Sequence, residues 1–162
     1  MNTTIEPVMK SIDVGSVISK DDLAELIRAA EAESVERRAN ACEIMADLAC
    51  CTGSENYFST MMKSIVFTDG VLLFAELAQA HWLIDLIASH QLAPDTIPDK
   101  DFQAWHVVRV GESAALALCG DGEDTGYRIM QEIPYTDLPM PSMEIWVENN
   151  GEQTVLLLPS EH

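Results

Sequence analysis

Two side chains that could transfer protons or bind a metal lie four residues apart in a long apolar segment. They are His81 and Asp85, and the segment is Thr68–Gln91. Residues spaced by four share one face of a helix, so this pair could act as a general acid and base or supply two metal ligands. A metal site needs three or four ligands, and the sequence offers no second pair with matching spacing. A local hydrogen bond at the edge of a buried helix is the simpler interpretation.

A second group of candidate ligands lies in the acidic loop of residues 120–126. The loop contains the carboxylates Asp121, Glu123 and Asp124, and calcium prefers oxygen ligands of this kind. It lacks the regular alternation and the closing Glu of an EF-hand. Because Gly and Asp are also common turn residues, a hairpin turn is the simpler interpretation here, and we predict no cofactor.

The constrained loop Pro134–Pro139 is a candidate for binding rather than for catalysis. Its polar residues Tyr135, Thr136 and Asp137 lie between two prolines, and loops held in this way often carry function. The loop could equally be a rigid crossing between two strands, and the sequence favours neither interpretation.

Other motifs with a known chemistry do not occur in the sequence. There is no GxSxG, no Walker loop, no GxGxxG before a helix and no HExxH. The four cysteines are Cys42, Cys50, Cys51 and Cys119. Their spacing matches no usual zinc pattern, and we expect thiols that pack as small apolar side chains.

Helical spacing dominates the first part of the chain. Ser19 is predicted to begin a helix, with Asp22 completing a capping box, and apolar residues repeat at helical spacing up to a stop near Gly53. Thr68–Gln91 is predicted to be one long helix, apolar on most of its circumference and therefore buried. It is long enough to span a membrane, but the acidic residues near its centre argue against insertion into lipid.

From Phe102 onward the apolar pattern alternates in the manner of strands. The predicted strands are Phe102–Val110, Ala114–Cys119, Tyr127–Ile133, Met143–Glu148 and Thr154–Leu158. A further short strand is expected within Ser64–Thr68. Helices followed by antiparallel strands indicate an α+β domain, with the N-terminal helices packed on one face of a mostly meander sheet of about five strands. We expect residues 19–162 to form this single domain and residues 1–18 to form an N-terminal arm.

The composition is that of an acidic globular chain. The 162 residues are 48% hydrophobic, and 27 acidic against nine basic residues give a formal net charge of −18. Such a charge repels nucleic acid and anionic membrane and attracts basic protein surfaces, although acidity also serves solubility alone. The first residues lack the basic start and apolar run of a signal peptide, and we expect a cytoplasmic protein.

Five short motifs together resemble an uncharacterised bacterial family. They are FTDG at Phe67–Gly70, HWLIDLIASHQ at His81–Gln91, FQAWHV at Phe102–Val107, IPYTDLP at Ile133–Pro139 and LLLPSEH at Leu156–His162. The resemblance covers roughly Leu48–His162. This family is catalogued as a domain of unknown function, with members on bacterial, plasmid and phage genomes, and it implies no activity. It implies a prokaryotic or mobile-element origin, and it adds Asp69 to the binding candidates of the Pro134–Pro139 loop.

Three classes of function follow from these observations. The leading hypothesis is a non-enzymatic acidic protein that binds a partner protein with a basic surface, and not nucleic acid or membrane directly. Its narrower form is an inhibitor that occupies the nucleic-acid-binding surface of a host defence protein, which requires the acids to gather on one face. The second hypothesis is a small enzyme or metal-binding protein that uses His81, Asp85 and nearby carboxylates in one pocket. The third is a self-associating structural protein that forms a homodimer through the first helix or an edge strand.

Overall fold

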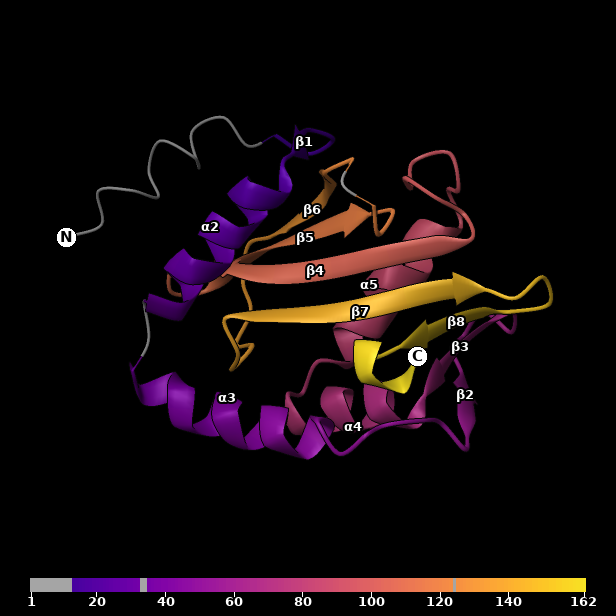
Figure 1. The fold of residues 1–162 in the computed structure, drawn as a ribbon, viewed down its shortest axis with the longest axis horizontal. Helices are drawn as coiled ribbons and strands as arrows, with labels where there is room; N and C mark the ends of the chain where they lie inside the picture. The colour runs from indigo at the N-terminus through magenta and orange to yellow at the C-terminus, as the bar shows by residue number, and fades with distance from the viewer. Residues whose placement is uncertain (1–12, 33–34, 124) are drawn as a thin grey trace.

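The computed structural model describes residues 13–32, 35–123 and 125–162, which form a sheet with helices on both faces (Figure 1). The helices are α2 (Lys20–Ala32), α3 (Val35–Leu48), α4 (Asp69–Leu77) and α5 (His81–Gln91), and the 3-10 turn η1 (Pro159–Glu161) follows the last strand. The strands are β1 (Val17–Ile18), β2 (Tyr57–Ser59), β3 (Ile65–Thr68), β4 (Phe102–Val110), β5 (Ala114–Gly120), β6 (Tyr127–Ile133), β7 (Ser142–Asn149) and β8 (Thr154–Leu157).

The eight strands form a single sheet in the order β1-β6-β5-β4-β7-β8-β3-β2. Neighbouring strands are antiparallel except β3 and β8, which run parallel. The central strand β4 is buried from Gln103 to Val110 because β5 and β7 flank it and helices cover it. The parallel pair places Val66 opposite Val155, so the segment that leads into α4 lies beside the end of the chain.

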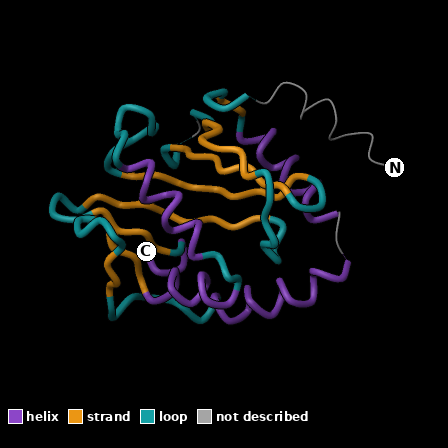
Figure 2. The backbone as a smooth tube through the Cα atoms, turned by 180° about the vertical axis from the view of Figure 1, so that it is seen from behind, coloured by secondary structure: helices purple, strands orange, loops and turns teal. Residues whose placement is uncertain are grey.

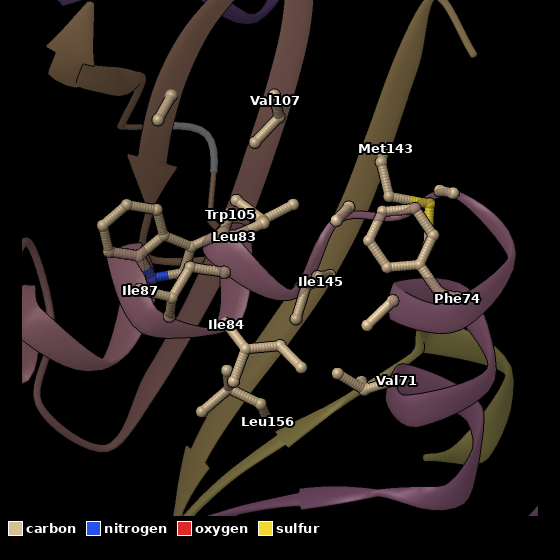
Figure 3. Packing of buried hydrophobic residues seen from close by; sticks show 14 of the residues in the cluster. Val71, Phe74, Leu83, Ile84, Ile87, Trp105, Val107, Met143, Ile145 and Leu156 are labelled. Carbon is tan, nitrogen blue, oxygen red and sulfur yellow. The ribbon is translucent and has the colours of Figure 1, made fainter. Parts of the chain in front are cut away.

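The larger part of the core lies between the sheet and α3, α4 and α5. Seen from behind, α5 crosses the strands and α3 runs along one side of the sheet (Figure 2). Figure 3 shows Phe74 of α4 and Ile84 of α5 turned toward Ile145 and Leu156 of the sheet, and all four side chains are buried in one cluster. Burial of the apolar side chains between the sheet and these helices is the main contribution to the stability of the fold.

The opposite face of the sheet is covered by α2. Leu23 and Leu26 of this helix pack with Ala104 and Val108 of β4 in a second buried cluster. Successive residues of a strand point to opposite faces, so β4 supplies Trp105 and Val107 to the larger cluster and Ala104, Val108 and Val110 to the smaller one. The prediction that the N-terminal helices pack on one face is therefore wrong, since α2 and α3 lie on opposite faces.

The predicted long helix is divided into α4 and α5. Gln79 has a φ of +53°, a left-handed conformation that ends a helix, and the Ala80 N–H donates to the Ala75 carbonyl oxygen at 2.9 Å. Apolar spacing continues across this break, which is why the sequence indicated one helix. The helix predicted from Ser19 is likewise two helices, and their junction at residues 33–34 lies outside the described residues.

The other predicted elements agree closely with the structure. The strands β4 and β6 have the predicted bounds, and β5, β7 and β8 differ by single residues at their ends. The capping box is confirmed, because the Asp22 N–H donates to Ser19 Oγ at 3.1 Å and the Ser19 N–H donates to Asp22 Oδ2 at 3.2 Å. The α+β class is confirmed, and the short strand expected within Ser64–Thr68 is β3. The sheet of the described residues has eight strands rather than five, because β3 joins it and because β1 and β2 are too short to show an alternating pattern.

Part of the predicted arm belongs to the sheet. Val17 and Ile18 form β1 and pair with Arg128 and Tyr127 of β6, while residues 1–12 lie outside the described part of the chain. Within the described ranges, no helix has both the length and the apolar character that a membrane crossing requires.

The left-handed residue between α4 and α5 is open to a direct test. Gln79→Gly is expected to raise the free energy of unfolding by about 0.5–1 kcal/mol, because glycine has no Cβ to clash at positive φ. The matched control is Ser89→Gly at an exposed position within α5, which should lower it by about 0.5 kcal/mol. Urea unfolding followed by circular dichroism measures both. Destabilisation by Gln79→Gly would contradict the assigned conformation.

Candidate functional site

The pair His81 and Asp85 is exposed at the start of α5. Neither residue lines the cavity that lies between α2, α3 and the segment before β7. Within the described residues, no three His, Cys, Asp or Glu side chains lie close enough together to hold a metal ion. The enzyme hypothesis required His81, Asp85 and loop carboxylates to share a pocket, and the structure provides no observation that favours it.

The carboxylate of Asp121 stabilises its own turn. Its Oδ2 accepts a hydrogen bond from the Thr125 hydroxyl at 2.5 Å, and its Oδ1 accepts one from the Glu123 N–H at 2.9 Å. The Thr125 hydrogen bond is the main reason that the pKa of Asp121 is lowered. Asp124 lies outside the described residues. The geometry fits the hairpin-turn interpretation of this loop.

The loop Pro134–Pro139 has one buried anchor and two exposed polar residues. Thr136 is buried, its N–H donates to the Ser113 carbonyl oxygen at 2.5 Å, and its hydroxyl oxygen accepts from the Leu138 N–H at 3.1 Å. Tyr135 is 75% exposed and Asp137 is also exposed. Thr136 therefore fastens the loop, and Tyr135 and Asp137 are free of that structural role.

Asp69 at the start of α4 holds the loop before β2. Its Oδ2 accepts from the N–H groups of Glu55 and Asn56 at 3.1 and 2.9 Å. The Asn56 N–H is the largest of the influences that lower the pKa of Asp69. The carboxylate that we predicted to bind a ligand is thus engaged within the protein.

The residue that organises this region is Glu161, which the sequence did not single out. Its carboxylate accepts four hydrogen bonds, from Ser54 Oγ at 2.8 Å, Thr68 Oγ1 at 2.5 Å, the Gly70 N–H at 2.9 Å and the Leu158 N–H at 2.9 Å. A Cβ at position 70 would lie 2.6 Å from Cδ of Glu161. The FTDG and LLLPSEH motifs therefore form one structural unit, in which a carboxylate also compensates the positive end of α4.

A thiol lies near this unit. Burial is the first reason that the pKa of Cys51 is raised, and the negative charge of Glu161 is the second. Cys51 is therefore a protonated thiol at neutral pH, which is a poor nucleophile and a poor metal ligand.

The strand β7 presents a row of polar and aromatic side chains on the face that also carries α2. Met143, Ile145 and Val147 point into the core, and the intervening Glu144, Trp146 and Glu148 are partly exposed. We call Glu144, Trp146 and Glu148 the acidic strand face. The carboxylate side chains of Glu144 and Glu148 are 40% and 33% exposed.

Neighbouring groups orient the acidic strand face. Trp146 Nε1 donates to Glu144 Oε1 at 2.7 Å, and His162 Nδ1 lies 2.7 Å from Glu148 Oε1. The Trp146 ring meets the rings of Phe102 and His162 edge-on, with centroid separations of 5.1 and 5.2 Å. Two carboxylates are thus held on either side of one aromatic ring, an arrangement suited to a cationic group.

A buried histidine lies beside this face. His106 is opposite Glu144 in the β4–β7 register, and its Nε2 is 3.7 Å from Glu144 Oε1. This Nε2 is buried and has no hydrogen-bond partner among the described residues, and the ring packs edge-on against Tyr127. Burial lowers the pKa of His106, and the negative charge of Glu144 opposes this effect. The histidine is therefore neutral at neutral pH and does not cancel the charge of the face.

The sequence contains a signal that would have identified the acidic strand face. In the predicted strand Met143–Glu148, Glu144, Trp146 and Glu148 are spaced by two and must share one face. Trp146 is partly buried and also packs against the smaller core cluster, so its residue type alone does not indicate which face it occupies. The alternation of the whole strand is the better guide, because its other face is uniformly apolar.

These features define an α+β protein with one mixed sheet. The Glu161 carboxylate holds the start of α4, and β7 carries the acidic strand face. Residues 42–162 match the model of a family of unknown function, DUF6876, and the chain belongs to that family. No curated protein matches the sequence. A crystal structure of a protein of unknown function from Enterococcus faecalis is similar at 19% identity and a TM-score of 0.43, over 61% of this chain and 90% of that chain. The resemblance seen in the sequence is thus confirmed at the level of the family.

The close approach of Gly70 to Glu161 gives a double-mutant test. On helix propensity alone Gly70→Ala should stabilise by about 1 kcal/mol, but here it should destabilise by about 1–3 kcal/mol because the Glu161 carboxylate is displaced from its donors. In a Glu161→Ala background the same change should be neutral or stabilising. Chemical denaturation of the four proteins measures the coupling. Equal effects in both backgrounds would contradict this assignment.

The buried histidine predicts a pH dependence of stability. Because the pKa of His106 is lowered, the unfolded chain binds its proton at a higher pH than the folded protein does. The free energy of unfolding should therefore fall as pH decreases below about 6.5, and His106→Phe should flatten this dependence. His81→Gln, at an exposed position, is the control and should leave the slope unchanged. An unaltered slope in His106→Phe would show that other groups cause it.

Proposed function

We propose that this protein is a non-enzymatic acidic protein that binds the basic surface of a partner protein through the acidic strand face. The observation that carries the proposal is the alignment of Glu144, Trp146 and Glu148 on a partly exposed strand face of a chain with a net charge of −18. In Figure 1, α2 lies over the part of the sheet formed by β4, β5 and β6, and β7 runs beyond it.

The chemistry of the face fits a lysine or arginine side chain. A cation placed over an indole ring is stabilised by about 0.5–2 kcal/mol, and the flanking carboxylates supply charge-assisted hydrogen bonds. Exposed ion pairs contribute little one by one. Several contacts on one rigid strand, together with long-range attraction by the net charge, are needed for useful affinity.

A narrower form of this proposal concerns the partner. Protein surfaces that bind nucleic acid are rich in lysine and arginine, and a strongly acidic protein competes with nucleic acid for them. In this form the protein is an inhibitor that occupies the nucleic-acid-binding surface of a host protein, in line with the prokaryotic or mobile-element origin that the family resemblance implies. Displacement by DNA distinguishes this form from binding to other basic surfaces.

The first test uses a fluorescently labelled arginine-rich peptide and measures anisotropy at low and high salt. Glu144→Gln/Glu148→Gln should weaken binding about tenfold, because both carboxylates that flank Trp146 lose their charge. Glu76→Gln/Glu132→Gln removes the same charge from exposed positions elsewhere and should weaken it less than threefold. Equal weakening by both pairs would show that only diffuse charge is involved, and absence of binding at low salt would overturn the proposal.

A second test addresses the natural partner. Affinity capture from a bacterial lysate is performed with the wild-type protein and with both double variants, and bound proteins are identified by mass spectrometry. A partner should be retained by Glu76→Gln/Glu132→Gln and lost from Glu144→Gln/Glu148→Gln. Added duplex DNA should release it if the partner surface binds nucleic acid. A partner captured equally by all three proteins would contradict a role for β7.

A further inference from the structure

A cavity of about 390 Å³ lies where α2, α3 and the segment before β7 meet. Its apolar lining includes Ala30 of α2, Ala41 and Met45 of α3, and Met140. Cavities that bind small organic molecules begin at about 300 Å³ and are mostly apolar with a few fixed polar groups. The size and the lining are therefore those of a small-ligand site.

The buried charged group in the lining of this cavity is the guanidinium of Arg109, near the end of β4. Arg109 is only 7% exposed. Its Nη2 donates to the Glu112 carbonyl oxygen, while its Nε is buried and has no hydrogen-bond partner among the described residues. Buried charges in proteins are normally paired, because an isolated charge in an apolar surrounding is costly. Arg109 forms no ion pair with any carboxylate of the described residues.

A second guanidinium strengthens the positive character of the cavity. Arg37 also lines it, and its Nη1 donates to the same Glu112 carbonyl oxygen at 3.0 Å. Two guanidinium groups are thus held at one oxygen atom in a chain that carries only nine basic residues. The acidic residue in the lining, Glu31, is exposed. An anion placed between these two guanidinium groups would compensate the buried charge of Arg109.

We propose that this cavity binds a small amphiphilic anion, with its carboxylate against Arg109 and Arg37 and its hydrocarbon part against Ala41, Met45 and Met140. A carboxylate matches the planar, paired donors of a guanidinium. The apolar lining excludes a ligand that is polar throughout, because its other groups would lose their hydration without compensation. The site uses positive charge and a concave surface, so it is independent of the acidic strand face.

Cys42 provides a direct readout, because it is exposed and lines the cavity. In a Cys50→Ser/Cys51→Ser background the remaining described thiols are Cys42 and the buried Cys119. Octanoate should slow the reaction of Cys42 with a thiol reagent in a saturable manner. Octanol, which has the same chain without charge, should protect at least tenfold less, since it forms no charge-assisted hydrogen bond.

Variants then separate the ligand site from a structural role of the arginine. Arg109→Met should abolish protection by octanoate and should not lower thermal stability, because replacing an uncompensated buried charge with an apolar side chain is often neutral or stabilising. Met45→Asp places a negative charge at an exposed lining position. It should weaken the binding of octanoate, measured as protection of Cys42, about tenfold without altering Arg109. The control Arg128→Gln, in β6, should retain full protection.

Several outcomes would overturn the proposal. Equal protection by octanol and octanoate would show that the cavity binds hydrocarbon without recognising the carboxylate. Unchanged protection in both Arg109→Met and Met45→Asp would place the ligand elsewhere. Octyl phosphate is included as a third probe, and stronger protection by it than by octanoate would reject the carboxylate as the head group. Because these measurements involve no basic peptide, they succeed or fail separately from the binding of a partner protein.

Discussion

The carboxylate of Glu161 is the interaction on which the arrangement of this protein depends. It lies at the end of the chain and accepts hydrogen bonds from the loop before β2, from the last residue of β3 and from the first turn of α4. These donors are close to it only because β3 and β8 pair in parallel. Thr68 is buried, so loss of the carboxylate would leave a buried hydroxyl without its acceptor, which is more costly than loss of a surface hydrogen bond.

The division of the sheet into two covered faces follows from this anchor and from the alternation of β4. One face receives α4, whose start is fixed by Glu161, together with α5, and the other face receives α2. Because α2 packs over β4 and its neighbours toward β6, the outward residues of β7 remain partly exposed. The acidic strand face is thus a consequence of how far one helix extends across the sheet. Its rigidity comes from the buried alternate residues of the same strand.

Two regions of opposite charge character result. The outward residues of β7 are acidic and lie beside an aromatic ring, which suits cations, whereas the cavity at the other end of β7 contains a buried arginine, which suits anions. The two regions favour different ligands, and neither depends on the His81 and Asp85 pair from which a catalytic function was first considered.

The sequence by itself determined the α+β class, the principal strands, the capping box at Ser19 and the family, because these depend on local periodicity, on short-range hydrogen bonds and on contiguous motifs. It did not reveal the break at Gln79, since apolar spacing continues across it. It also did not reveal the short strands β1 and β2, which exist only because longer strands pair with them.

The candidate sites were harder to predict from the sequence than the fold was. Asp69 and Thr136 were predicted as binding residues, and the tertiary structure shows that both form hydrogen bonds within the protein. Only the tertiary structure brought Glu161 to α4 and Arg37 to Arg109, because these partners are far apart in sequence and are joined by long-range packing.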